Sequence, residues 1–151
     1  MSIDFAHGFI ELYLQIPARS YNLSRLEVLQ SLQIKITQKT LLKTSSLAAI
    51  ESIFHTIASP VFSELEFIIW FSQGTKADCF PEDFFGTLRR MYCAKPFKLA
   101  FLLIVWADGE VWGEGWRGWV NTAVNEGPLS CLESPPSIRF SWDGVYEPYL
   151  G

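Results

Sequence analysis

The chain contains few charged residues. Asp, Glu, Lys and Arg make up 19% of its 151 residues, and the formal net charge is −4. Proteins that bind nucleic acid usually carry an excess of Lys and Arg, which displaces counterions from the phosphates. No such excess is present, so we expect no nucleic-acid partner.

Cysteine and histidine are also scarce. The three cysteines, Cys79, Cys93 and Cys131, are odd in number and widely spaced, so they do not predict a disulfide framework and they favour a reducing compartment. The two histidines, His7 and His55, do not have the spacing of a metal site or a proton relay. We therefore expect no metal or other cofactor, and we predict no catalytic residues.

Long hydrophobic runs are absent. The longest, residues 99–106, is far shorter than the roughly 20 residues that a membrane-spanning helix needs. Residues 1–5 include an early acid and lack the basic segment of a secretory signal. We expect a cytoplasmic or nuclear protein with no membrane partner, in which residues 1–151 form one domain. The composition does not predict an oligomeric state.

The clearest pattern is a repeated switch between alternating segments, which are typical of strands, and segments with helical spacing. The expected strands are residues 10–16, 32–37, 61–71, 97–106 and 138–142, and the expected helices are residues 44–57, 81–92 and 116–124. The first of these strands is expected to be an unpaired edge of the sheet.

The predicted strands are evenly spaced. Their centres, taken at Leu12, Ile34, Phe67, Leu102 and Ile138, are separated by 22, 33, 35 and 36 residues. Such regularity is typical of repeat proteins, and strands joined through helices run parallel. We predict an α/β fold, a short solenoid with a parallel sheet of about five strands and helices mainly on one face. A doubly wound α/β sandwich is the alternative.

The alternation indicates which face of the sheet is free of helices. In the first, second and last predicted strands one face is apolar and the other is polar, whereas a sheet covered on both sides is apolar on both. On the two central strands the second face is more apolar and carries Ile68 and Trp70. These residues are either covered or form an exposed patch that marks a binding surface.

Two segments resemble a known family. Residues 23–34, LSRLEVLQSLQI, have the LxxLxxLxxLxI spacing of a leucine-rich repeat, and residues 57–65 read IASPVFSEL. Together they resemble the degenerate repeat region downstream of the F-box in many proteins of mushroom-forming fungi, most clearly over residues 23–71. The resemblance implies a leucine-rich-repeat-like solenoid that recruits a protein to a ubiquitin ligase. We expect the chain to lack the F-box itself, because the resemblance begins near its first residues, and Thr37 stands near the place of the usual Asn or Cys.

The leading functional hypothesis is a non-catalytic module that holds a protein partner on the helix-free face of the sheet. Parity along the strands identifies the candidate residues, because side chains two positions apart share a face. The candidate partner-binding residues are Tyr13, Lys35, Ile68, Trp70 and Arg139.

The alternative is a small enzyme or ligand-binding protein with a site in the Gly- and Trp-rich segment 106–119. Residues 113–118, GEGWRG, match the G-x-G-x-x-G pattern of a dinucleotide site, and clustered tryptophans could form an aromatic platform. The candidate ligand-binding residues are Trp106, Asp108, Trp112 and Trp116. Because the preceding strand is expected to end well before the first glycine, we interpret residues 113–118 as a glycine-rich loop rather than a cofactor site.

Overall fold

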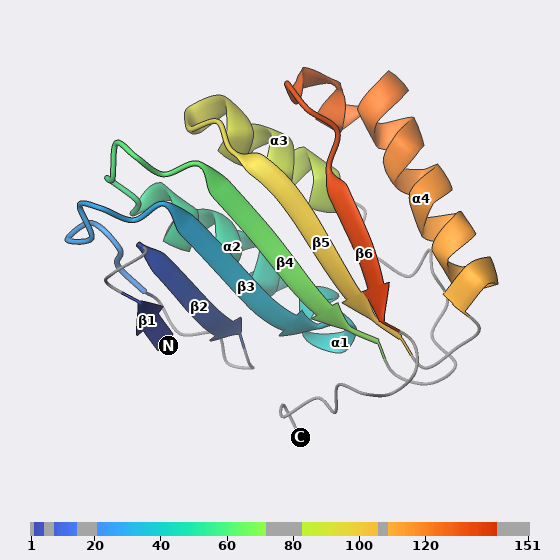
Figure 1. The fold of residues 1–151 in the computed structure, drawn as a ribbon, viewed down its shortest axis with the longest axis horizontal. Helices are drawn as coiled ribbons and strands as arrows, with labels where there is room; N and C mark the ends of the chain where they lie inside the picture. Colours follow the sequence, from blue (N-terminus) through green and yellow to red (C-terminus); the bar gives the residue numbers. More distant parts are fainter. Residues whose placement is uncertain (1, 5–7, 15–20, 72–82, 106–108, 142–151) are drawn as a thin grey trace.

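The computed structural model describes residues 2–4, 8–14, 21–71, 83–105 and 109–141, without the side chains of residues 2–4, 44 and 109–113. It contains one six-stranded sheet, in which the strands lie side by side in chain order (Figure 1). The strands are β1 (Ser2–Asp4), β2 (Phe9–Leu14), β3 (Ser31–Thr37), β4 (Glu64–Trp70), β5 (Lys98–Ile104) and β6 (Ser137–Ser141). β1 is antiparallel to β2, and β2 to β6 are all parallel. The fold is therefore α/β, as predicted.

Helices connect most of the parallel strands. They are α1 (Gln38–Leu41), α2 (Thr44–His55), α3 (Phe84–Ala94), α4 (Gly109–Glu126) and the short 3-10 helix η1 (Pro128–Cys131). In Figure 1, α2 and α3 lie behind the sheet. The helix expected at residues 44–57 corresponds to α2, but its N-cap is Lys43 and not one of the hydroxyl residues 44–46. The sequence did not predict α1 or the first two turns of α4.

One face of the sheet is the core. The register places Leu12, Ile34, Phe67 and Phe101 side by side across four strands, and each of these side chains is fully buried. Side chains of α2, α3 and α4 belong to the same core cluster. Among them, Trp116 of α4 packs edge-on against Phe101 at a centroid distance of 5.2 Å.

The strand order does not match the doubly wound alternative. A doubly wound sheet reverses its strand order at a switch point, with helices on both faces. Here the parallel strands follow one another in chain order without a reversal, and the described helices of ten or more residues pack on the same face. The alternation of polar and apolar residues in the outer strands therefore correctly predicted that the helices lie mainly on one face of the sheet.

The first edge of the sheet differs from expectation. β2 was predicted to be an unpaired edge, but β1 pairs with it, with Ile3 opposite Ile10. Between the two strands Gly8 adopts a φ of +61°, and its carbonyl oxygen accepts hydrogen bonds from the backbone N–H groups of Gln30 and Ser31 at 2.7 and 3.1 Å. This turn attaches the N-terminal hairpin to the start of β3.

Backbone hydrogen bonds join successive segments of the chain where β3, β4 and β5 begin. The N–H of Gln30 donates to Gly8, that of Ser63 to Gln30, and that of Lys98 to Ser63, at 2.7, 2.9 and 2.8 Å. The donor and acceptor of these bonds are 22, 33 and 35 residues apart, the same separations as the predicted strand centres. Where β3, β4 and β5 begin, the chain is therefore bonded each time to the residue that precedes the previous strand.

Candidate interaction surface on the open sheet face

The face of the sheet opposite the core is called the open face here. The strand register arranges its side chains in rows that cross the sheet. The middle row consists of Tyr13, Lys35, Ile68, Leu102 and Arg139, and the next row contains Thr37, Trp70, Ile104 and Ser141. The structure thus brings all five predicted partner-binding residues onto one face, four of them in a single row. That they bind a partner stays a prediction.

Lys35 is held by its neighbours on β2. Its Nζ lies 3.3 Å from Glu11 Oε2 and 3.3 Å from the hydroxyl oxygen of Tyr13, and 4.9 Å from the centroid of the Tyr13 ring. Burial lowers the pKa of Lys35, but the hydrogen bonds to Tyr13 and Glu11 outweigh burial, so the pKa is raised overall. The ammonium group is therefore charged at neutral pH and is engaged with β2.

Glu66 on β4 is held from both sides. It accepts a hydrogen bond from Gln33 Nε2 on β3 and one from Arg139 Nη2 on β6 at 2.9 Å. Since Arg139 is 61% exposed and Glu66 is 21% exposed, water screens this ion pair and its contribution to stability is small. Its main effect is to neutralise the Glu66 carboxylate.

The apolar part of the open face is buried. Ile68 and Trp70 are each 8% exposed and Ile104 is 2% exposed, and they form a second cluster with the partly buried Tyr13 and Leu102. The sequence left open whether this apolar patch is covered or exposed, and the structure shows that it is covered. Ile68 and Trp70 therefore present little surface to a partner. Within the described part of the chain, the indole N–H of Trp70 has no hydrogen-bond acceptor.

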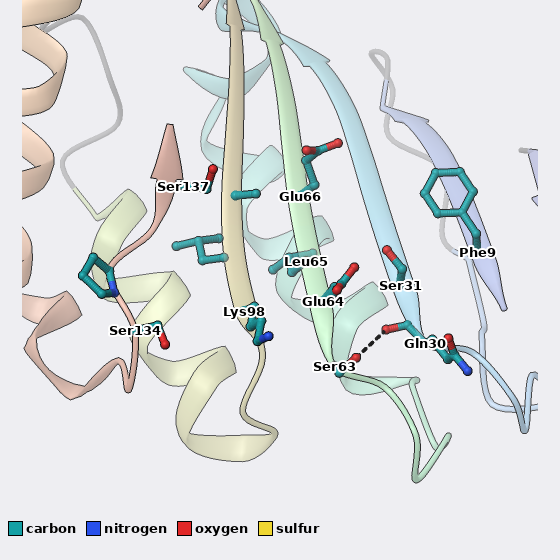
Figure 2. Close-up of a pocket in the computed structure, with 13 residues that line it drawn as sticks. Phe9, Gln30, Ser31, Ser63, Glu64, Leu65, Glu66, Lys98, Ser134 and Ser137 are labelled. Carbon is teal, nitrogen blue, oxygen red and sulfur yellow. Dashed lines mark hydrogen bonds between the residues drawn. The ribbon is translucent and has the colours of Figure 1, made fainter. Parts of the chain in front are cut away.

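A shallow groove of about 710 Å³ crosses the open face where the strands begin (Figure 2). It is lined by Phe9, Gln30, Ser31, Ser63, Glu64, Leu65, Glu66, Lys98, Leu99, Ala100, Ser134, Pro135 and Ser137. None of the five predicted partner-binding residues lines it, although Arg139 bonds to Glu66, which does. The sequence signal that could have revealed the groove is the run of polar residues at the equivalent starts of β3, β4 and β5.

A smaller cavity of about 200 Å³ lies next to this groove. The two share Ser63, Lys98 and Ser134. Most of the other side chains that line the smaller cavity are aromatic or proline: Phe62, Tyr92, Pro96 and Phe97, with Glu133 beside them. A recess whose aromatic side chains belong to the core cluster or pack against it therefore adjoins the groove where β5 begins.

The glycines of the alternative site in segment 106–119 do not form the predicted loop. Gly113, Gly115 and Gly118 lie inside α4, and a helical backbone does not leave the N–H groups free to cradle a phosphate. The predicted glycine-rich loop was therefore wrong: the apolar face of α4, which packs into the core with Trp116 and Val120, outweighs the poor helix propensity of glycine.

The predicted ligand-binding residues of that segment do not form a described platform. Trp116 is 0% exposed and packs against Phe85, Phe101 and Trp119, so it is a core residue and not a ligand contact. Trp106 and Asp108 lie outside the described residues, as does the side chain of Trp112.

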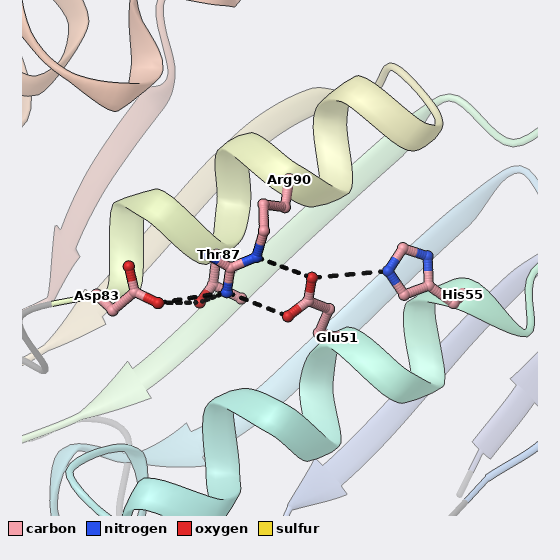
Figure 3. Close-up of polar contacts among 5 residues, drawn as sticks. All are labelled: Glu51, His55, Asp83, Thr87 and Arg90. Carbon is pink, nitrogen blue, oxygen red and sulfur yellow. Dashed lines mark hydrogen bonds and ion pairs between the residues drawn. The ribbon is translucent and has the colours of Figure 1, made fainter.

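A polar cluster on the exposed side of α2 and α3 involves a histidine and two acids (Figure 3). Glu51 accepts two hydrogen bonds from Arg90, at 3.1 and 3.2 Å, and lies 3.7 Å from His55 Nε2. Arg90 also contacts Asp83 at 3.3 Å and Thr87 at 3.1 Å. The hydrogen bond from Arg90 lowers the pKa of Glu51 despite opposing partial burial. Because Arg90 bonds to both carboxylates, the cluster joins the two helices.

The described part of the chain shows neither a cluster of metal-binding side chains nor a membrane-spanning helix. No group of three or more His, Cys, Asp or Glu side chains there could hold a metal ion. No helix in those ranges has the length and apolar character needed to span a membrane.

Comparison with known proteins adds no family assignment. No protein-family model, no curated protein and no solved structure matches the chain significantly.

Proposed function

We propose that this chain is a non-catalytic protein-protein interaction module: a short leucine-rich-repeat-like solenoid that resembles the substrate-recruiting repeat region of F-box proteins. The observation that carries the proposal is the open face itself, a parallel sheet with no described helix over it and a groove of about 710 Å³ along one end. A surface of this form offers a partner both hydrogen-bonding groups and shape.

Three features support the solenoid. The strands follow chain order, the longer helices share one face, and backbone hydrogen bonds link equivalent positions of successive units. Each unit thus buries its apolar face against its neighbours, which is how repeat proteins are built. The leucine-rich-repeat-like residues 23–34 run directly into β3, as the resemblance implies.

The character of the open face favours a protein as the partner. Its residues combine carboxylates, amines, hydroxyls and aromatic rings, and the charges of both signs balance across β2 to β6. A surface without a single-sign field has no electrostatic preference for nucleic acid or an anionic membrane. Mixed polar and aromatic surfaces of this kind suit protein-protein contact.

The proposal is tested by comparative affinity capture from cell extract with three immobilised proteins. They are the wild-type chain, an open-face variant with Tyr13→Ala, Lys98→Ala and Arg139→Ala, and a helix-face control with Arg89→Ala and Glu126→Ala. Bound proteins are identified by mass spectrometry, after thermal unfolding has shown that all three chains are folded. Proteins retained by the wild type and the control but lost with the open-face variant support the proposal. An identical set on all three contradicts it.

A further inference from the structure

The open face carries two charged side chains that are not paired with any described residue. Of the six charged side chains at open-face positions of β2 to β6, four form the two ion pairs described above. The other two, Glu64 and Lys98, are both exposed and make no hydrogen bond or ion pair with any other described residue. The face therefore keeps one anion and one cation available.

Glu64 and Lys98 are direct neighbours in the groove. They are register partners on β4 and β5, whose backbones lie about 4.8 Å apart, and both line the groove. Figure 2 shows the Glu64 carboxylate turned toward β3 and away from Lys98. The groove therefore presents opposite charges side by side, each free to meet a partner group.

The dimensions of the groove suit an extended chain that crosses the strands. Its lining reaches from Phe9 on β2 to Ser137 on β6, and four strand spacings correspond to about 19 Å. At about 3.3 Å per residue, an extended segment of roughly six residues covers this length.

We propose that the groove binds an extended peptide segment of a protein partner in which a basic and an acidic residue stand two positions apart. The basic residue pairs with Glu64 and the acidic residue with Lys98. In an extended chain such residues point to the same side, about 7 Å apart, a distance that the flexible Glu and Lys side chains accommodate. This inference rests on the proposed function, since it names the chemistry of the partner at the same surface.

The smaller cavity predicts a third residue of the peptide and its place relative to the two charged ones. It adjoins Lys98 and is lined by Tyr92, Phe97 and other apolar side chains. Buried apolar anchors in such recesses dominate the affinity of many interfaces. The peptide therefore carries an apolar residue beside its acidic residue, on the side away from its basic residue.

The experiment is a selection of random short peptides by display against three folded proteins. The first is the wild-type chain, the second is the charge-swapped variant Glu64→Lys with Lys98→Glu, and the third is a control, Arg89→Glu with Glu126→Lys, that swaps exposed charges on the helices. The wild type and the control are expected to enrich peptides in the order basic, acidic, apolar. The charge-swapped variant is expected to enrich the order acidic, basic, apolar.

The enriched peptides then allow a quantitative test. Synthesised and measured by calorimetry against wild type, Glu64→Gln and Lys98→Met, they are expected to bind each variant about two- to fivefold more weakly, the range for exposed ion pairs. The charge-swapped variant is expected to bind the charge-swapped peptide as tightly as wild type binds the original.

The outcomes separate this inference from the proposed function. Three outcomes overturn the inference and leave the capture result intact. Either the enriched peptides lack the charge pair, or the charge-swapped variant enriches the same order as the wild type, or no peptide is enriched at all. If instead the capture profile does not depend on the open face, the proposed function itself fails, whatever the peptides show.

Discussion

Gly8 connects β1 to β2 with a backbone φ of +61°, in the region that residues with a side chain rarely adopt. A Cβ at this position would overlap the carbonyl oxygen of Val28. We therefore expect Gly8→Ala to lower the free energy of unfolding by about 2 kcal/mol or more, from backbone strain and the clash together. Urea denaturation of both proteins measures this difference.

Gly118 is the matched control for Gly8. It lies within α4, and an added Cβ would have no heavy atom within 4 Å. Because alanine has a higher helix propensity than glycine, Gly118→Ala should raise the free energy of unfolding by about 0.5–1 kcal/mol. If both substitutions had the same sign, the strain assigned to Gly8 would be wrong.

Trp70 is buried on the open face with an indole N–H that meets no acceptor among the described residues. Replacing it with Phe removes an unpaired donor and keeps a large ring, so we expect Trp70→Phe to change the free energy of unfolding by less than about 1 kcal/mol. Trp70→Ala leaves a cavity and should cost about 3–5 kcal/mol. Thermal and urea unfolding of the two variants provide the measurement. A large loss in Trp70→Phe would mean that the N–H has a partner.

At the scale of elements, the contact between α2 and α3 depends on a charged pair that responds to pH. The pKa of Glu51 is lowered mainly by its hydrogen bond from Arg90, so the stabilisation is fully present above the ordinary carboxylate range. It is lost as the pH falls through the lowered pKa, where Glu51 is protonated in the folded chain. A double-mutant cycle with Glu51→Gln and Arg90→Met should give a coupling of about 0.5–1 kcal/mol at pH 7, and the coupling should decline as the pH falls through the lowered pKa of Glu51.

The salt dependence of this cycle checks the physical cause. Arg90 is 52% exposed, so added salt should weaken the coupling at pH 7. A coupling that persisted unchanged in acid and in high salt would show that the two side chains interact through packing instead of charge.

The elements that could be predicted are those with a strong period in the sequence. Alternating apolar residues such as Leu12 and Ile34 predicted β2 and β3 and their buried face, because side chains in a strand alternate between its two sides. β1 has only three residues and no period to detect. The start of α4 was missed because glycines lower local helix propensity, whereas burial of Trp116 depends on contacts with β5 and α3.

At the scale of the whole molecule, the candidate surface was predicted only in part. Parity placed Tyr13, Lys35 and Arg139 on the open face correctly, since it depends only on neighbours along one strand. The groove depends on register between strands that are more than 30 residues apart in sequence, as with Glu64 and Lys98. The pattern within one strand does not show which residue of the next strand lies opposite it. The even spacing of the predicted strands would nevertheless have allowed Glu64 to be placed near Lys98.

The described units also share a core, and this determines how the molecule unfolds. Phe54 of α2 contacts Phe62, which precedes β4, and Phe97, which precedes β5, at centroid distances of 5.8 and 5.5 Å. Since one ring packs against neighbouring units, Phe54→Ala should cost about 3–5 kcal/mol and should destabilise β3 and β5 together. Native-state hydrogen exchange should show equal losses of protection in both strands, as a cooperative core requires. Loss confined to β3 would mean that the units unfold one at a time, as weakly coupled repeats do.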